Sequence, residues 1–334
     1  MDLDTILCKE RGRLTRAAVG AIRTAIRRTF PQQGYVGIPP EERHFVWNIV
    51  SLTAPALGFK WGAILGPYGV SLKVGAVYCH QTPMVHFDGM SKECVELGDL
   101  LFIHIHKSPL NPIRRFSLLL QAKKCDETPH MVKKDEEDQL HLYERWPEFT
   151  YTQSGSLTGQ TRRVLPPQAH TGGQYLLIHP VANRKTAVVG ACMPTKKLSP
   201  HAGLAEELWR VLVGASGRAF GDCAYARASN GWSRVMWDLL TATAALPFTR
   251  EKTGVQGFER GQAVRFVFAK GGVFTTLAGN SLADDDFPDV LTPDGDRPAL
   301  AEGDGFGVPA IVVCTETFDH EPRRLPEEPR GKAQ

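Results

Sequence analysis

Two apolar segments joined by a short, proline-containing stretch constrain the fold of this chain more than any other feature. The segments are LGDLLFIHIH (97–106) and FSLLLQAK (116–123), and the residues between them include Pro109 and Pro112. Apolar runs of this length predict buried strands, and the prolines predict a loop between them. Strands connected this closely pair antiparallel. We therefore expect a β-hairpin inside a larger sheet.

The rest of the pattern predicts an α/β protein with a central mixed sheet flanked by helices. Helical spacing of apolar residues predicts helices over 10–29, 41–53, 135–146, 202–213 and 232–246. Residues that favour strands predict strands over 70–78, 84–87, 174–179, 186–193, 263–268 and 308–315.

Composition indicates a soluble protein of the cytoplasm. The chain of 334 residues is 42% hydrophobic and 22% charged, which is typical of globular proteins. Its first residues lack an apolar signal segment, and no apolar run reaches the roughly 18 residues that a membrane span needs. The seven cysteines are scattered and form no CxxC pair, which favours a reducing compartment over a disulfide framework. We expect no membrane partner.

Charge is distributed unevenly along the chain. The helix predicted near the N-terminus is strongly basic, and Arg16, Arg23 and Arg27 are candidates for contact with nucleic acid, as is Lys124. Such a run also occurs on ordinary solvated helix faces, and that alternative stays open. The segment 284–304 is acidic instead.

Three polar residues of the hairpin are candidates for catalysis. Gln121 and Lys123 lie on the same face of their strand because side chains alternate, and antiparallel pairing brings Asp99 beside them. Asp99, the side-chain oxygen of Gln121 and the backbone carbonyl of Ala122 are the hard oxygen ligands that Mg²⁺ or Mn²⁺ prefers. Lys123 would orient or deprotonate the attacking water, and burial beside a metal would lower its pKa. The pattern predicts metal-dependent phosphodiester cleavage.

These residues, with a helix motif that follows them, resemble a known family. The strings ELGD (96–99), QAK (121–123) and QLHLY (139–143) are similar to the motifs of the PD-(D/E)xK nuclease superfamily. The last matches the QxxxY helix of its RecB-like branch, and Gln at position 121 occurs in its Mrr-like members. Gln139 and Tyr143 share one helix face and would support the site.

The resemblance carries expectations for fold and function. It implies a restriction-endonuclease-like core over 1–152, followed by an α+β elaboration over 153–320, packed on the core or part of the same domain, and a disordered tail over 321–334. It implies a nuclease, acting on DNA and most simply as an endonuclease, and is compatible with restriction or anti-phage defence. It implies nucleic acid as the partner and is compatible with a homo-oligomer or a larger defence complex.

Departures from the family pattern keep two alternatives open. Gln121 removes a negative charge from the metal site, and Glu10 is the only candidate for the glutamate that many members carry on their first helix. Glu96, three residues before Asp99, is expected on the opposite face unless a bulge intervenes. The chain could therefore be a weak or inactive nuclease fold that binds or scaffolds nucleic acid, or a nuclease directed at RNA. His104 and His106 are expected to be structural.

Overall fold

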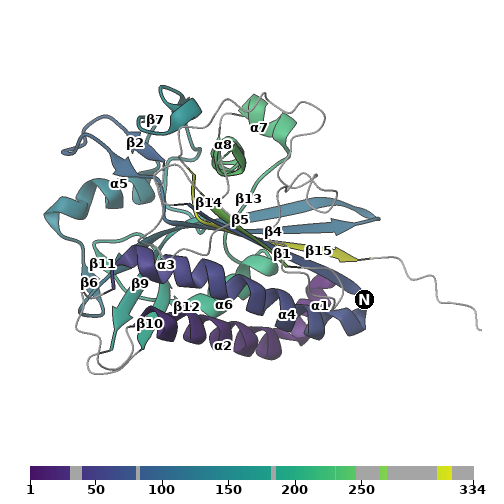
Figure 1. The fold of residues 1–334 in the computed structure, drawn as a ribbon. Helices are drawn as coiled ribbons and strands as arrows, with labels where there is room; N and C mark the ends of the chain where they lie inside the picture. Colours follow the sequence, from purple (N-terminus) through teal and green to yellow (C-terminus); the bar gives the residue numbers. More distant parts are fainter. Residues whose placement is uncertain are drawn as a thin grey trace, which may run out of the picture.

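The computed structural model describes residues 1–30, 40–79, 83–181, 186–229, 231–245, 263–268 and 307–317. In this part of the chain, nine strands form one mixed sheet with helices on both faces (Figure 1). The predicted α/β class with a central mixed sheet is therefore confirmed. The acidic segment 284–304 and the tail 321–334 lie outside the described residues.

The predicted hairpin lies in the middle of the sheet. Strands β4 (Leu100–Ser108) and β5 (Asn111–Lys124) pair antiparallel, with Leu100 opposite Leu120. The stretch that was expected to be a loop is mostly strand, and only the residues around Pro109 form the turn. Pro112 lies beside an irregularity in the register, where a missing backbone N–H costs the ladder little.

Parallel neighbours enclose the hairpin on both sides. On one side β9 (Gly173–Pro180) pairs with β5, and the connection between them carries helix α5 (Glu137–Arg145). On the other side β15 (Ala310–Thr317) lies between β4 and β1 (Val70–Cys79). Because strands from both halves of the chain share this sheet, residues 153–320 do not form a separate unit, and the single-domain alternative is the better description.

The remaining strands extend the sheet or lie beside it. In the main sheet they are β10 (Ala187–Cys192), β12 (Ala202–Gly203), β13 (Arg218–Ala219) and β14 (Ala263–Phe268). A small sheet contains β2 (Met84–His86), β3 (Val95–Glu96), β7 (Phe149–Tyr151) and β8 (Thr161–Arg162). A third pairs β6 (His130–Met131) with β11 (Lys197–Leu198).

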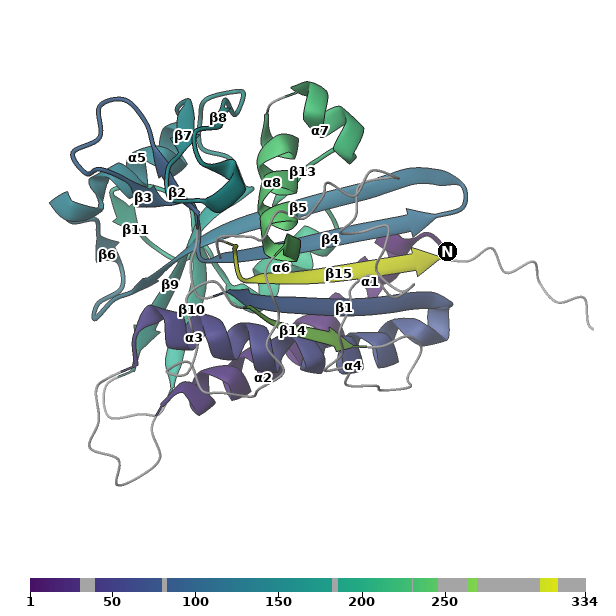
Figure 2. The ribbon, with the colours of Figure 1, turned by 45° about the horizontal axis from the view of Figure 1, so that its top comes forward.

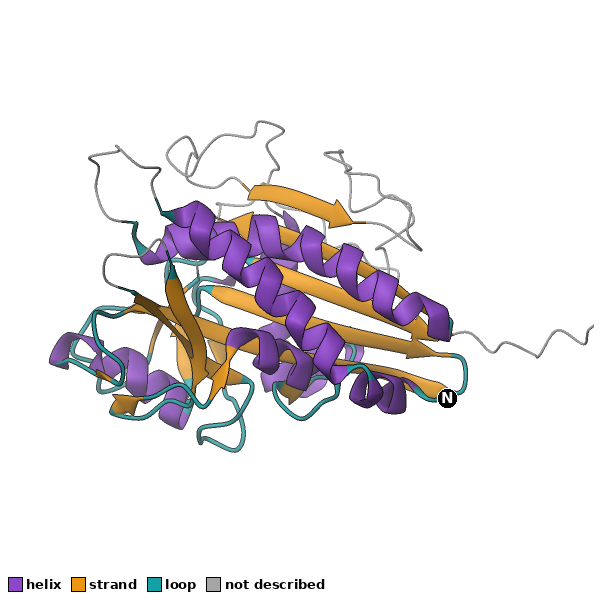
Figure 3. Ribbon diagram, turned by 90° about the horizontal axis from the view of Figure 1, so that it is seen from below, coloured by secondary structure: helices purple, strands orange, loops and turns teal. Residues whose placement is uncertain are grey.

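Helices cover both faces of the main sheet (Figures 2 and 3). One layer contains α1 (Leu3–Lys9), α2 (Arg11–Thr29), α3 (Glu42–Asn48), α4 (Ala54–Leu65) and α6 (Leu204–Leu212). The opposite face carries α5, α7 (Cys223–Ser229), α8 (Trp232–Ala245) and the small sheet of β2, β3, β7 and β8. Short helical turns are η1 (Ile49–Thr53), η2 (Gly66–Tyr68), η3 (Lys134–Glu136) and η4 (Gly155–Leu157). Each face therefore has its own apolar core.

The helix predicted over 41–53 continues much further than expected. The π-helical turn η1 joins α3 to α4, and Pro55 is tolerated because it lies in the first turn of α4. The resulting run, Glu42–Tyr68, has 27 residues and is apolar enough to cross a membrane, contrary to the expectation from the sequence. Leu57 and Trp61 are fully buried against the sheet, so one side of this run belongs to the apolar core.

Candidate active site

Asp99 immediately precedes β4, at a point where β5 continues beyond its neighbour. The backbone N–H of Asp99 donates to the Leu120 carbonyl at 2.9 Å, and its carboxylate Oδ2 accepts the Ala122 N–H at 2.8 Å. The N–H and C=O of an extended residue point to the same side of a strand, so the Ala122 carbonyl also faces the side of Asp99. This placement brings the predicted carboxylate and carbonyl ligands together.

Gln121 projects toward Asp99 from β5. Its amide Nε2 donates to Asp99 Oδ2, while Oε1 is buried and accepts no hydrogen bond from any described residue. The amide therefore offers Asp99 its nitrogen, and it would have to turn over to offer a metal its oxygen. A carboxylate at this position would repel Asp99, so the amide stabilises the arrangement without a metal.

Glu42, the first residue of α3, reaches the same strand edge. Its Oε1 accepts the Lys124 backbone N–H at 2.6 Å. Ala122 and Lys124 are two residues apart, so their N–H groups point the same way. Two carboxylates from distant segments thus cap successive N–H groups of β5 that have no neighbouring strand.

Glu96 lies on the same side as Asp99, although alternation predicted the opposite face. Glu96 ends β3 in the small sheet and Asp99 enters the main sheet, so the chain leaves one strand between them and alternation does not apply. Gly98 permits this passage, because a Cβ there would lie 2.7 Å from Leu119 Cδ1 and 2.9 Å from Tyr143 Oη. The Tyr143 hydroxyl donates to the Leu97 carbonyl at 2.8 Å and so supports the segment.

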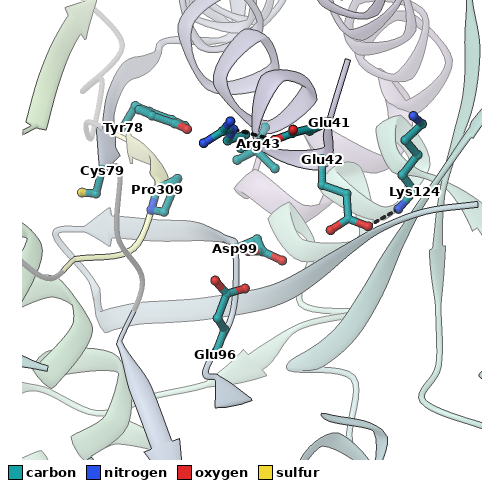
Figure 4. A pocket seen from close by; sticks show the side chains of 10 residues that line it. Glu41, Glu42, Arg43, Tyr78, Cys79, Glu96, Asp99, Lys124 and Pro309 are labelled. Atoms are coloured by element: carbon teal, nitrogen blue, oxygen red, sulfur yellow. Dashed lines mark hydrogen bonds and ion pairs between the residues drawn. The ribbon is translucent and has the colours of Figure 1, made fainter. Parts of the chain in front are cut away.

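The three carboxylates line a cavity of about 590 Å³ that also contains Arg43 and Tyr78 (Figure 4). Burial and the neighbouring charge of Glu96 raise the pKa of Asp99 well above its usual value. Burial also raises the pKa of Glu42, despite its bond to the Lys124 N–H. Burial is the larger cause of each shift, and the neighbouring carboxylates add to it.

Lys123 lies on the α5 side of the sheet, held by an acid that the sequence did not suggest. Its Nζ is 2.7 Å from Glu136 Oε1, and Glu136 Oε2 accepts from the Lys133 N–H at 2.9 Å and lies 2.9 Å from His130 Nε2. Burial opposes the charge on Lys123, but Glu136 and Glu42 outweigh it, so the pKa of Lys123 is raised. The lowered pKa expected beside a bound metal stays a prediction. The same contacts outweigh burial at Glu136 and lower its pKa to about 2.

The donor set fits a hard divalent cation. Among the described residues, no three His, Cys, Asp or Glu side chains stand close enough together to hold a metal as they are placed. Yet Glu42, Glu96 and Asp99 share one cavity, and the pKa of Asp99 stays raised. Gln121 Oε1 has no hydrogen-bond partner in the part of the chain that the structure describes. A bound Mg²⁺ would offset the charge and draw these oxygens inward.

The remaining predicted residues lie at varying distances from this cluster. Glu10 lies between α1 and α2, at the other end of the helical layer from the start of α3 (Figure 2), where it binds Tyr68 and Arg13. It is therefore not a supporting residue. Arg16, Arg23 and Arg27 are all exposed on α2, and Arg27 lies in its last turn. Lys124 lines the cavity. Gln139 lines a smaller cavity between α5 and the sheet.

Sequence reasoning missed Glu42, Glu96 as a member of the cluster, and Glu136. The start of α3 held a signal for the first, because a glutamate in the first turn of a helix that follows the basic helix is a second candidate for the helical glutamate of the family. Glu136 ends the short turn η3, one residue before α5 and three before Gln139, next to the helix that carries the third motif.

Comparisons with known proteins add no relative to this picture. No family model, no curated protein and no solved structure matches the chain significantly.

Proposed function

We propose that this protein is a metal-dependent nuclease of the PD-(D/E)xK type that hydrolyses phosphodiester bonds, with DNA as its substrate. One observation carries the proposal: Asp99 and Gln121 come together on an antiparallel hairpin that is followed by α5 and a parallel strand. Lys123 follows Gln121 by two residues and so lies on the same face of β5. Two further carboxylates, Glu42 and Glu96, surround Asp99. The arrangement agrees with the order of motifs that suggested the family.

Each residue has a role in this proposal. Asp99, Glu96 and the Ala122 carbonyl would hold Mg²⁺ or Mn²⁺, joined by Gln121 through its oxygen and by Glu42. The ion supplies an acidified water and offsets charge on the phosphate. Lys123 keeps its proton because of Glu136. As a cation it would orient the water or balance transition-state charge.

The cellular setting belongs to the same proposal. A soluble protein with seven free cysteines suits the reducing cytoplasm. A role in restriction or anti-phage defence, as a homo-oligomer or within a larger complex, would follow from the family resemblance.

A second candidate is a nuclease fold that binds nucleic acid without cutting it. The observation in its favour is the amide nitrogen of Gln121 on Asp99, which forms a stable pair with no metal. Under this alternative the chain would be a binding or scaffolding subunit.

Cleavage assays separate these alternatives. The purified protein would be incubated with plasmid DNA, linear DNA and RNA, each with Mg²⁺, Mn²⁺ or EDTA. We expect metal-dependent cutting of DNA that Lys123→Ala abolishes and that Lys60→Ala, at an exposed lysine on α4, leaves unchanged. Cutting of RNA alone would redirect the proposal to RNA, and binding with no cutting of any substrate would support the scaffold.

Calorimetry gives a readout that does not depend on the substrate. Titration of the wild type with Mg²⁺ should show binding that Asp99→Asn weakens by at least ten-fold, because a charged oxygen ligand is lost. Equal binding by both proteins would remove the metal site from the proposal even if cleavage were observed.

A further inference from the structure

A second cavity lies directly behind the acid cluster. It has a volume of about 340 Å³ and lies between β5, β9 and the start of α5. Glu42 and Glu96 line both cavities, so the two spaces adjoin at the proposed metal site. A group bound in the second cavity would lie next to the scissile phosphate.

Three buried polar groups of this cavity have no hydrogen-bond partner among the described residues. They are Gln121 Oε1, Gln139 Nε2 and the Tyr175 hydroxyl. Gln121 and Tyr175 are paired in the parallel register of β5 and β9, so both project from the same face of the sheet, and Gln139 approaches from α5. Gln121 and Tyr175 are more than nine-tenths buried, with exposed fractions of 7% and 3%.

Such unpaired groups are costly. A buried donor or acceptor without a partner costs roughly 1–3 kcal/mol, so three in one small space point to a ligand that satisfies them. Once Gln121 turns its oxygen toward the metal, its amide nitrogen takes the place of Oε1, and the three groups then offer two amide donors and a hydroxyl that can donate or accept. That combination suits a planar ring with both carbonyl and N–H groups.

The charges around the cavity exclude a phosphate as its occupant. Two cations face four carboxylates, and the charged lining residues are Lys92, Lys123, Glu42, Glu96, Asp135 and Glu136. A second negative group would be repelled, whereas a neutral polar ring would not. Met84, Val95 and Leu198 supply apolar walls for the faces of such a ring.

We propose that this cavity binds one unpaired base of the strand being cut, so that the substrate is single-stranded, frayed or flipped at the cleavage site. The inference rests on the proposed nuclease function and deepens it. A base held by Gln139 and Tyr175 would fix the strand relative to Asp99, and extracting it from a duplex would cost a few kcal/mol.

Binding can be tested without cleavage. Fluorescence anisotropy would follow a labelled 12-nucleotide single strand with Ca²⁺ in place of Mg²⁺, together with strands that carry one abasic site moved along the sequence. We expect one abasic position to weaken binding by roughly five-fold or more, as loss of a base contact does. An equal response at every position would overturn the inference.

Conservative variants connect that effect to the cavity. Tyr175→Phe removes only the hydroxyl and should weaken binding of the intact strand by roughly three- to ten-fold. It should leave the affinity for the sensitive abasic strand unchanged, because the contact is already absent. Tyr151→Phe, at a fully buried tyrosine of the small sheet, is the matched control and should have no effect. Equal weakening of both strands by Tyr175→Phe would contradict the proposal.

The outcomes also separate this inference from the proposed function. Metal-dependent cleavage with no sensitive abasic position would overturn the base site and leave the nuclease in place. If one abasic position weakens binding but no substrate is cleaved, the base site would stand and the nuclease function would be overturned. Competition by a free nucleoside, with no sensitive position in the strand, would assign the cavity to a free ligand and overturn its role in binding the strand.

Discussion

Strand β4 carries two polar clusters that differ in how their groups are satisfied. Just before its start, Asp99 lies among other carboxylates and has a raised pKa. Further along, His104 and His106 are buried, and burial lowers the pKa of both, to about 3 for His104. Each histidine lies within hydrogen-bond distance of the Thr315 hydroxyl, at 2.9 and 3.1 Å.

The difference separates a structural cluster from a candidate site. The histidines are neutral and share one hydroxyl between β4 and β15, so the fold alone accounts for them, as expected for structural residues. The acids repel one another, and the backbone N–H groups and cations of the described protein offset their charge only in part, so the pKa values of Asp99 and Glu42 stay raised. Proteins keep such destabilising charge clusters where function requires them.

The largest expected effect comes from Asp99→Asn. Asparagine can still accept from the Ala122 N–H but carries no charge, so cleavage should fall by at least about 100-fold. The free energy of unfolding should rise by about 1 kcal/mol, because a buried, repelled carboxylate is removed. Cleavage rates and urea unfolding measure the two. A variant that is inactive and also destabilised would place Asp99 among the structural groups.

The two clusters should respond to pH with opposite signs. His104 has a lowered pKa, so the unfolded chain binds more protons below pH 6.5 and stability is lost as pH falls. By pH 5 this one group should cost about 2 kcal/mol. Asp99 has a raised pKa, so it destabilises as pH rises above about 4.

Urea unfolding at pH 5 and pH 7 tests the predicted loss of stability from His104. His104→Gln keeps a nitrogen donor near the position of Nε2 but does not titrate. Its loss of stability between pH 7 and pH 5 should be smaller than that of the wild type by about 2 kcal/mol. His170, whose pKa burial also lowers to about 3, titrates in both proteins and cancels in the difference. Equal losses would show that His104 is not held neutral.

The sequence predicted the hairpin and the partners on it, but not the residues that join them from elsewhere. Alternation and one short connection suffice to place Asp99 near Gln121. Glu42 reaches Lys124 across 82 positions, and the parallel partner β15 comes from about 200 residues away, so neither leaves a local pattern. The failure for Glu96 has another cause, since the chain changes sheets at Gly98 and the alternation ends.

The ion pair of Lys123 and Glu136 tests the comparison of the two clusters in another way, because these two charges beside the carboxylates neutralise each other. Glu136→Gln keeps the shape but removes the charge that holds Lys123. We expect kcat to fall about ten-fold with little change in KM, since a positioned cation acts mainly in the transition state. Glu136→Asp should recover part of the loss. An unchanged kcat would show that Lys123 does not depend on this partner.

The smallest expected effects come from removing either of two tyrosine hydrogen bonds, those of Tyr143 and Tyr68. Tyr143 donates to the Leu97 carbonyl below Glu96 and Asp99, while Tyr68 donates to Glu10 at 2.6 Å, away from them. Each Tyr→Phe change should lower the free energy of unfolding by about 1 kcal/mol. Only Tyr143→Phe should also slow cleavage, by a few-fold, because it loosens the segment that carries the acids. Equal slowing by Tyr68→Phe would return Glu10 to the site and remove the distinction between the two tyrosines.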